Sequence, residues 1–305
     1  MVEDAYASCA RDARVHYENF PVASLLLPRG VRVHVTAVYA FARAADDFAD
    51  EGERTVEERK RLLDGWMERL REAASSGEPG PAPRRGEPPS TVAIFLAVGE
   101  TIRACSLPPG LFEDLLSAFR QDVERTRYAT WAELLDYCRR SANPIGRLVL
   151  RIGGHRDAQL DAWSDDICTA LQLTNFWQDL KADYDRGRVY LPREEQHLHG
   201  AREEDLAAGR MTPAWQEALS AGVLRTRGLF DAGRPLCDAV RGRLRYELRA
   251  TWLGGTRILD RLARTGFDVA NRRLVHGVLD APWFAWRLLT WAGPRNRTDP
   301  GGGGS

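Results

Sequence analysis

Apolar and polar positions along this chain of 305 residues follow the spacing of helices far more than that of strands. Residues 31–50 predict one helix, because one face recurs at steps of three or four residues: Val35, Tyr39, Arg43, Asp46 and Asp50. Strand-like alternation is scarce, so we predict an all-α fold. Further helices are predicted over residues 55–74, 90–105, 109–126, 130–152, 157–184, 212–240 and 242–266.

A stretch rich in proline and glycine, residues 75–90, interrupts the helical pattern. The 74 residues before it look incomplete as a core, so we interpret the stretch as a surface loop and not as a linker between domains. We therefore predict a single domain over residues 1–295 and a flexible tail over residues 296–305, which ends in GGGGS.

Three features bear on location in the cell. The first residues lack the basic and apolar regions of a signal peptide, and no apolar run approaches the roughly 20 residues of a membrane span. Residues 281–292 are short and aromatic, and they predict either a packed terminal helix or an interfacial contact with a membrane. We expect a cytoplasmic protein, with any peripheral membrane contact at the inner face.

Composition narrows the chemistry. Lys+Arg and Asp+Glu balance at 43 each, so we expect no nucleic-acid partner. Five scattered cysteines show no zinc-ligand spacing, and we expect reduced, mostly buried thiols. The run at residues 153–155 lacks GxGxxG and a preceding strand, so no nicotinamide cofactor is expected.

Two oxygen-rich clusters each occupy the end of a predicted helix. The first contains Asp46, Asp47 and Asp50, and the second contains Asn175, Asp179 and Asp183. Acidic side chains in a last helical turn oppose the helix dipole at a cost of roughly 0.3–1 kcal/mol each, and bound cations would remove this cost. Carboxylate oxygens suit Mg²⁺, which completes its shell with water and phosphate oxygens. We therefore predict two or three Mg²⁺ ions between the clusters.

Polar neighbours of these clusters indicate an anion bound together with the metal. Tyr39 and Arg43 share the face of the first cluster, and Gln172 shares that of the second. Arginine matches phosphate geometry, and Arg188 follows the second helix in a specific loop. Lys181 either binds phosphate or pairs with a neighbouring aspartate. The pattern indicates diphosphate chemistry.

Four ordered segments resemble the squalene/phytoene synthase family across residues 16–270: YAFARAADDFADEG (39–52), QDVERTRY (121–128), YCRRSANPIG (137–146) and LQLTNFWQDLKADYDRGRVYLP (171–192). The resemblance implies the all-α isoprenoid-synthase fold, with a central apolar cavity and facing Asp motifs near its mouth. It also implies an isoprenoid diphosphate substrate.

The resemblance also implies roles for individual residues. Asp46 and Asp50 match the first metal-binding pair, with Asp47 in the same triplet, and the second cluster matches the second metal motif. Positions near the diphosphate or the reacting carbons are matched by Tyr39, Arg43, Gln172, Arg188 and Tyr190. For the reaction that the resemblance implies, the aromatic residues Tyr39, Phe20, Tyr137 and Phe176 either stabilise a cation or pack in the core, and the candidates for positioning a water are Tyr137 and Asn143.

Two departures from the family pattern suggest a substrate with one diphosphate. Relatives often carry an HSKSF-like phosphate-binding stretch where this chain has HYENF, whose His16, Asn19 and Phe20 remain substrate-binding candidates. They also often carry arginine where this chain has Gln178. The alternative is drift compensated by other basic residues.

The chain looks most like the hydroxysqualene synthase branch of bacterial hopanoid biosynthesis, which acts on presqualene diphosphate. This resemblance predicts Mg²⁺-dependent formation of hydroxysqualene, with association with other enzymes of that pathway as a further expectation. The rival within the family is head-to-head condensation of two prenyl diphosphates to presqualene diphosphate, phytoene or dehydrosqualene. A rival of another class is a non-catalytic helical protein that binds lipid or a partner.

Overall fold

The structure is a computed structural model that describes residues 1–15, 27–76, 82–269, 284, 286–288 and 290–291. Within these residues the only β-type pairing is an isolated bridge between Arg127 and Val189, which confirms the all-α prediction. The thirteen helices of the described ranges are α1 (Val2–Val15), α2 (Arg29–Asp50), α3 (Val56–Ser76), α4 (Thr91–Cys105), α5 (Pro109–Asp122), α6 (Trp131–Ser141), α7 (Asn143–Ile152), α8 (Ala158–Asp185), α9 (Arg193–His199), α10 (Glu203–Ala207), α11 (Pro213–Gly233), α12 (Leu236–Ala239) and α13 (Arg243–Arg264).

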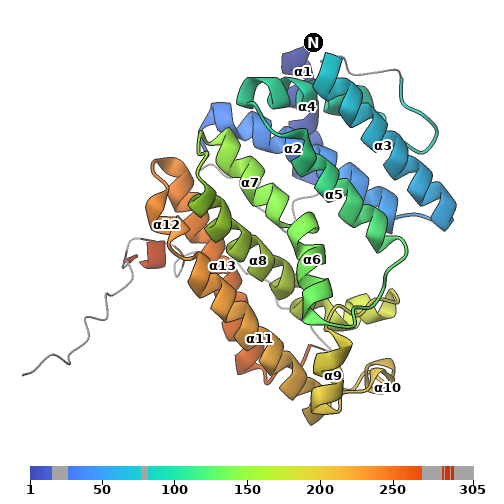
Figure 1. Ribbon diagram of the computed structural model, residues 1–305, viewed down its shortest axis with the longest axis vertical. Helices are drawn as coiled ribbons and strands as arrows, with labels where there is room; N and C mark the ends of the chain where they lie inside the picture. Colours follow the sequence, from blue (N-terminus) through green and yellow to red (C-terminus); the bar gives the residue numbers. More distant parts are fainter. Residues whose placement is uncertain (16–26, 77–81, 270–283, 285, 289, 292–305) are drawn as a thin grey trace, which may run out of the picture.

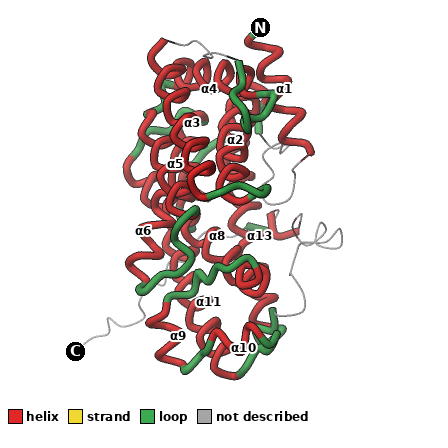
Figure 2. Tube along the Cα trace, turned by 90° about the vertical axis from the view of Figure 1, so that its right-hand side faces the viewer, coloured by secondary structure: helices red, strands yellow, loops and turns green. Residues whose placement is uncertain are grey.

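The helices form two groups that meet around α7 (Figure 1). In the first group, α2 packs against α1, α3, α4 and α5. In the second, α8 packs against α6, α11 and α13. Helix α7 contacts both α2 and α8, so it spans the region between the two groups, and Figure 2 shows the groups stacked along the long axis of the molecule.

An aromatic core fixes the orientation of α2. Phe41 is fully buried and packs against Trp66, Phe95 and Phe112, with ring centroids 5.4–6.0 Å apart. The Trp66 indole also donates a hydrogen bond to the Phe41 carbonyl oxygen at 3.3 Å. Truncating such a buried aromatic costs roughly 3–5 kcal/mol. Because this face of α2 is locked into the core, the opposite face, with Tyr39, is turned toward the second helical group.

Helix α8 is positioned by its N-cap and by its apolar face. The Asp157 carboxylate accepts hydrogen bonds from the backbone N–H groups of Gln159 and Leu160 at 2.8 and 3.0 Å, which satisfies donors of the first helical turn. The buried Trp177 indole donates to the Thr226 hydroxyl on α11 at 2.8 Å. These contacts set the rotation of α8, and with it the direction of its oxygen-rich face.

Prolines divide two of the predicted helices. Residues 130–152 form α6 and α7 with a break at Ala142, because Pro144 lacks an N–H and occupies the first turn of α7. The prediction over residues 212–240 is also interrupted, since α11 ends at Gly233 and Pro235 precedes α12. The predicted helix 109–126 ends at Asp122, and α1, α9 and α10 were absent from the prediction.

The described part of the Pro/Gly stretch, residues 82–90, lies outside any helix and is tied to α3. Arg69 donates to the Glu87 carboxylate through Nε at 3.0 Å and Nη2 at 2.9 Å, and both side chains are buried. Arg69 also donates to the Ala82 carbonyl oxygen at 3.0 Å. A desolvated, bidentate pair of this kind holds the loop against the first helical group.

In the aromatic segment predicted over residues 281–292, Trp291 packs edge-on against Trp252, with ring centroids 5.5 Å apart. Its indole donates to Asp238 at 2.8 Å, whereas Trp286 is 65% exposed. Most of this segment, and the tail 296–305, lie outside the described residues.

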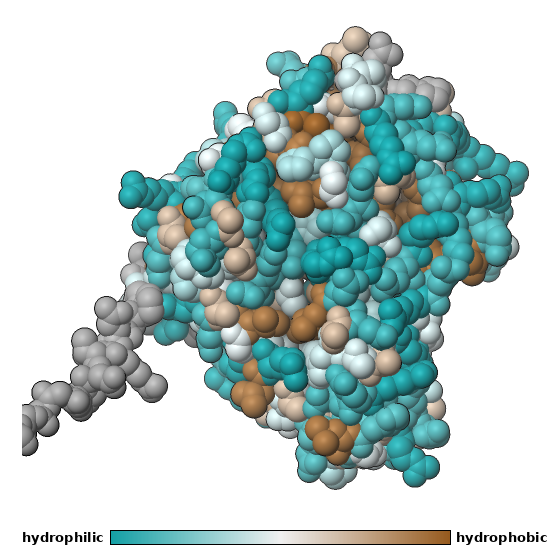
Figure 3. Space-filling view, viewed as in Figure 1, coloured by the Kyte–Doolittle hydropathy of each residue, from teal (hydrophilic) through white to brown (hydrophobic). Residues whose placement is uncertain are grey.

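Two further expectations concern thiols and membrane spans. All five cysteines are free, and three of them are buried, as predicted. No helix in the described ranges is long and apolar enough to cross a membrane. The face in Figure 3 is mainly hydrophilic, with apolar groups in separate clusters.

Candidate active site

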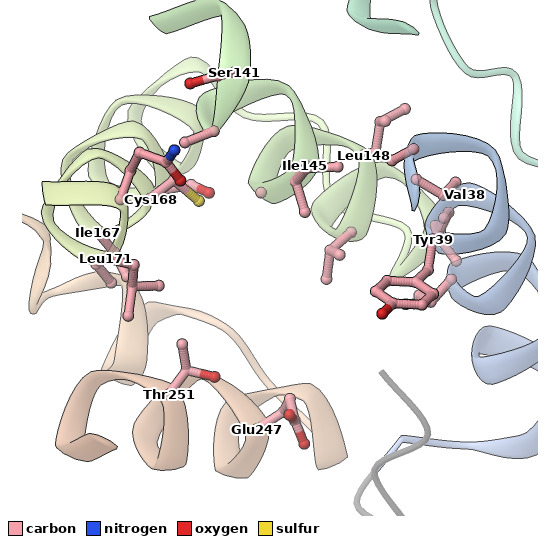
Figure 4. A pocket seen from close by; sticks show the side chains of 18 of the residues that line it. Val38, Tyr39, Ser141, Ile145, Leu148, Ile167, Cys168, Leu171, Glu247 and Thr251 are labelled. Carbon is pink, nitrogen blue, oxygen red and sulfur yellow. The ribbon is translucent and has the colours of Figure 1, made fainter. Parts of the chain in front are cut away.

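A cavity of about 570 Å³ lies between α2, α7, α8 and α13 (Figure 4). Its body is aliphatic, as expected for a site that binds a hydrocarbon. Figure 4 shows Val38 and Tyr39 on one side, Ile145 and Leu148 above, and Leu171 on the side of α8. The cavity is therefore the central apolar chamber that the resemblance implied.

Polar side chains collect where α2 and α8 approach their C-terminal ends. The cavity lining in this part comprises Tyr39, Arg43, Asp46, Glu51, Gln172 and Asn175. Five of these residues were predicted site residues. The same two helices thus supply both the apolar wall and this polar mouth.

Arg188 joins the two oxygen-rich helix ends. It lies just after α8, and its guanidinium donates to both carboxylate oxygens of Asp50 on α2, at 2.9 and 2.6 Å. A third hydrogen bond, of 3.3 Å, reaches the Asp122 carbonyl oxygen at the end of α5. The Arg188 side chain is only 16% exposed. The bidentate geometry holds three segments together at the mouth.

Like charges crowd this region. Burial raises the pKa of Asp46 to about 7, with repulsion from Asp50 acting in the same direction and Arg43 opposing it. Burial also raises the pKa of Asp183 to about 7, with Asp179 adding to the effect. Repulsion from Asp50 contributes to the shift at Asp183 as well, and Arg188, which follows α8 directly, binds Asp50 at the end of α2, so the two acidic helix ends lie close together.

This donor set fits Mg²⁺ bound together with a diphosphate. All six side chains of the two clusters offer hard oxygen ligands, and divalent cations would relieve the repulsion between them. No three His, Cys, Asp or Glu side chains in the described ranges are arranged to hold a metal ion directly. Each ion would therefore take few protein ligands and complete its shell with water and phosphate oxygens, which is the usual mode for Mg²⁺.

Arg43 lies within the first acidic cluster. Its guanidinium approaches Asp46 at 3.4 Å, Asp47 at 2.8 Å and Glu51 at 2.7 Å. Arg43 lines both the main cavity and a neighbouring hollow. Asp46 lines the main cavity, whereas Asp47 lines the hollow, so the two carboxylates lie on different sides of Arg43. Glu51 was not a predicted site residue, although its position next to Asp50 was a signal that could have identified it.

Asp122 is a further residue that the sequence analysis did not assign. It is buried and accepts a hydrogen bond from the Tyr137 hydroxyl at 2.6 Å. Burial raises the pKa of Asp122 to about 7, while the Tyr137 hydrogen bond and Arg188 lower it and Asp50 raises it. The QDVERTRY segment contains this residue, so the motif was recognised but its acid was given no role.

Three predicted aromatic residues, Tyr137, Phe176 and Tyr190, form a cluster of their own and are not among the residues that line the cavity. Tyr190 stacks on Phe176, with ring centroids 3.7 Å apart and an interplanar angle of 6°. Tyr137 lies 6.2 Å from Phe176, in the same cluster. Four aromatic side chains were predicted to stabilise a cation, and three of them lie within the described residues. Of these three, Tyr39 alone lines the cavity.

Other predicted site residues have local partners. The buried Asn143 accepts a hydrogen bond from the Thr169 hydroxyl at 2.9 Å, so it joins α7 to α8 behind the cavity. Lys181 pairs with Asp185 at 2.5 and 2.7 Å, which matches the ion-pair alternative for this residue. His16, Asn19 and Phe20 lie outside the described residues.

The sequence profile of squalene/phytoene synthases matches residues 13–280, which is most of the chain. The chain belongs to the squalene/phytoene synthase family. The members of this family are enzymes. The chain's membership in the family accounts for the order of its four motifs and for its all-α fold.

Several bacterial members of the family are similar over most of their length. A hydroxysqualene synthase of Rhodopseudomonas palustris is 37% identical over 270 residues, which cover 87% of this chain and 86% of the relative. A phytoene synthase of Thermus thermophilus is 31% identical over 274 residues, which cover 89% and 88%.

Solved structures of family members share the fold. A squalene synthase of Alicyclobacillus acidocaldarius is 39% identical, with a TM-score of 0.78 over 88% of this chain and 96% of that one. A dehydrosqualene synthase in complex with a ligand has a TM-score of 0.81 at 18% identity, over 95% and 97% of the two chains, and supports the fold alone.

Proposed function

We propose that this member of the squalene/phytoene synthase family is a hydroxysqualene synthase, which converts presqualene diphosphate and water to hydroxysqualene and pyrophosphate. The observation that carries the proposal is the mouth of the cavity, where Arg43 and Arg188 stand among facing acidic helix ends, next to an apolar chamber. Its similarity to a relative named hydroxysqualene synthase supports the same assignment.

The arginines act on the leaving group. Both guanidiniums stay charged over the physiological pH range and can donate several hydrogen bonds to the oxygens of departing pyrophosphate. Asp50 holds Arg188 in place, and the carboxylates around Arg43 hold it likewise. Cationic donors already positioned beside the developing charge lower the barrier, because they need little reorganisation during the reaction. Bound Mg²⁺, held by oxygens of the two clusters, would supply Lewis-acid neutralisation of the diphosphate charge.

The aliphatic body of the cavity acts on the carbocation that ionisation leaves behind. Its walls keep most water away while the cyclopropylcarbinyl cation rearranges and its ring opens. Tyr39 lines both the main cavity and the adjoining hollow, and Figure 4 shows its ring at the edge of the open centre, where an aromatic face can stabilise positive charge. Capture by water then gives the alcohol without a reduction step.

One observation favours a second candidate, the condensation of two prenyl diphosphates. A hollow of about 630 Å³ adjoins the mouth and shares Tyr39, Arg43 and Glu51 with the main cavity. A second prenyl diphosphate would need such a space. Similarity to a phytoene synthase at 31% identity is compatible with this candidate.

Separate incubation with presqualene diphosphate and with farnesyl diphosphate, each with Mg²⁺, distinguishes the candidates. Products are identified by mass spectrometry and pyrophosphate is quantified. The proposal expects hydroxysqualene and one pyrophosphate per presqualene diphosphate, with farnesyl diphosphate unchanged. Conversion of farnesyl diphosphate to a C30 diphosphate or hydrocarbon would establish condensation instead. No turnover of either substrate, or of geranylgeranyl diphosphate, from which phytoene would form, would favour the non-catalytic, lipid- or partner-binding alternative.

A further inference from the structure

An acidic side chain lines the cavity at a distance in sequence from both aspartate clusters. Glu247, on α13, is 5% exposed and belongs to the cavity wall, together with Thr251 one turn later on the same face. Figure 4 shows Thr251 projecting from α13 toward the open centre, with Glu247 on the same helix and Tyr39 across the opening. The four family motifs do not include either residue.

Packing places this pair on the hydrocarbon side of the mouth. A Cβ atom at Gly153, after the end of α7, would lie 2.8 Å from Leu244, so the start of α13 lies beside the connection from α7 to α8. A Cβ atom at Gly255 would lie 3.0 Å from Leu171, next to the mouth residue Gln172. Glu247 and Thr251 come between these two contacts, so they lie farther along the cavity than Gln172.

The local surroundings make a water-binding role physically reasonable. Leu244 and Leu248 flank Glu247 in the cavity lining, so the carboxylate of Glu247 and the hydroxyl of Thr251 stand among apolar side chains on this face of α13. A water in a protein interior needs two to four polar partners. One carboxylate and one hydroxyl, a turn apart on a single helix, provide two such partners on the α13 wall of this largely apolar cavity.

We propose that Glu247 and Thr251 hold the water that captures the rearranged cation, and that Glu247 accepts its proton. This inference rests on the proposed function. The water oxygen donates a lone pair to the cationic carbon and forms the C–O bond. The resulting oxonium loses a proton to the Glu247 carboxylate, which later releases it to solvent. The electron pair of the broken C–O bond has already left with pyrophosphate, so the step needs no oxidant or reductant.

Separation of this water from the leaving group has a chemical purpose. A water beside the diphosphate would reach the first cation before rearrangement and give an alcohol with the cyclopropane ring intact. A water held on α13, beyond Gln172, is kept apart from the carbon that has just lost pyrophosphate. Its position therefore favours the open-chain alcohol over the cyclopropyl one.

The test compares wild-type protein with Glu247→Gln, using presqualene diphosphate, Mg²⁺ and H₂¹⁸O. Pyrophosphate release and the fraction of product that carries ¹⁸O are measured together. For Glu247→Gln we expect pyrophosphate release within about threefold of wild type, a fall of at least tenfold in the alcohol fraction, and hydrocarbons formed by proton loss in its place. Thr251→Val should lower the alcohol fraction in the same direction.

Asp260→Asn is the matched control, because it also changes an acid to an amide on α13 but at an ion pair with Arg227 outside the cavity. It should leave the alcohol fraction unchanged. Circular dichroism melting verifies that each variant folds. Glu247→Asp keeps the carboxylate and should therefore form a larger alcohol fraction than Glu247→Gln. If Glu247→Gln does not fold, Glu247→Asp takes its place in the comparison with wild type.

The outcomes separate the two proposals. If wild-type protein forms the ¹⁸O alcohol and both Glu247 variants form the same fraction of it, the inference is wrong and the proposed function stands. If wild-type protein forms no oxygenated product, the proposed function fails and the inference fails with it.

Discussion

Arg188 and Asp50 are separated by 138 positions in sequence, and their side chains form a bidentate pair with hydrogen bonds of 2.9 and 2.6 Å. The pair joins the segment after α8 to the last residue of α2, so the two acidic helix ends depend on one guanidinium for their spacing. Burial opposes the charged form of Arg188, but hydrogen bonding to Asp50 raises its pKa above the ordinary value. This arginine therefore remains a cation at the mouth of the cavity.

Arg188→Lys should reduce kcat while preserving the fold. Lysine keeps the charge but loses the planar fork, so it can neither span both oxygens of Asp50 nor orient two donors toward pyrophosphate. We expect kcat for pyrophosphate release to fall by about 10²-fold. Arg193→Lys, at an exposed arginine five positions later, is the control and should stay within twofold of wild type. Equal activity of the two variants would show that Arg188 has no part in leaving-group departure.

Asp46→Asn and Asp179→Asn should impair metal-dependent ionisation. Each change removes a negative oxygen ligand from one of the facing clusters, so Mg²⁺ and substrate should bind more weakly. We expect pyrophosphate release at fixed Mg²⁺ to fall by about 10²- to 10³-fold. Chelation with EDTA should abolish the wild-type activity, and added Mg²⁺ should restore it.

The control for these variants is Asp64→Asn, at a carboxylate that pairs with Arg120 on the surface. It should behave as wild type in a titration of activity against Mg²⁺. Full activity of Asp46→Asn in the same titration would contradict the assignment of the first cluster.

The buried carboxyl of Asp122 should make stability depend on pH. Its pKa is raised to about 7 in the folded protein, chiefly by burial, and is about 3.9 when unfolded. The folded state therefore binds the proton more tightly, so this contribution to stability is complete below pH 3.9 and is lost as pH rises through 7. Between pH 5.5 and 8, the loss is about 2 kcal/mol.

Urea unfolding of wild type and Asp122→Asn over that range measures this contribution. Asparagine can still accept the hydrogen bond from Tyr137 but does not titrate, so the difference in unfolding free energy between the two proteins should change by about 2 kcal/mol from pH 5.5 to 8. Parallel curves would mean that Asp122 does not titrate in this interval.

The contact of Gly146 with α8 should tolerate no side chain. A Cβ atom there would lie within 2.5 Å of both the Ser164 hydroxyl oxygen and the Cys168 sulfur. Gly146→Ala should therefore lower the unfolding free energy by about 1–3 kcal/mol, because α7 must move away from α8. Adding Ser164→Ala and Cys168→Ala should recover more than half of the loss. Gly110→Ala, where nothing lies within 4 Å, is the control.

Long periodic helices were the easiest elements to predict. The expected helices 31–50 and 157–184 correspond to α2 and α8 within one or two residues, because each has an unbroken face and a clear end. The break at Ala142 was missed although Pro144 signalled it. The short helices α9 and α10 depend on tertiary contacts and have little periodic pattern of their own.

Site residues could be predicted only where they belong to a recognisable sequence motif. Tyr39, Arg43 and Asp46 lie at helical spacing on one face, so their convergence could be derived. Glu247 could not, because it stands among arginines in RLRYELR, which resembles an exposed helix. Its burial follows from the packing of α13 against α8, a relationship between distant segments that the local pattern does not encode.

Because α8 is a single helix of 28 residues, one rigid element carries part of the cavity wall at Cys168 and the acids at its end. An insertion of one residue between Cys168 and Asn175 would rotate everything beyond it by about 100° and advance it by about 1.5 Å. Asn175, Asp179 and Asp183 would then point away from α2. Evolution can therefore vary side chains along this helix one at a time, but it cannot change the number of residues between the two sites without losing their alignment.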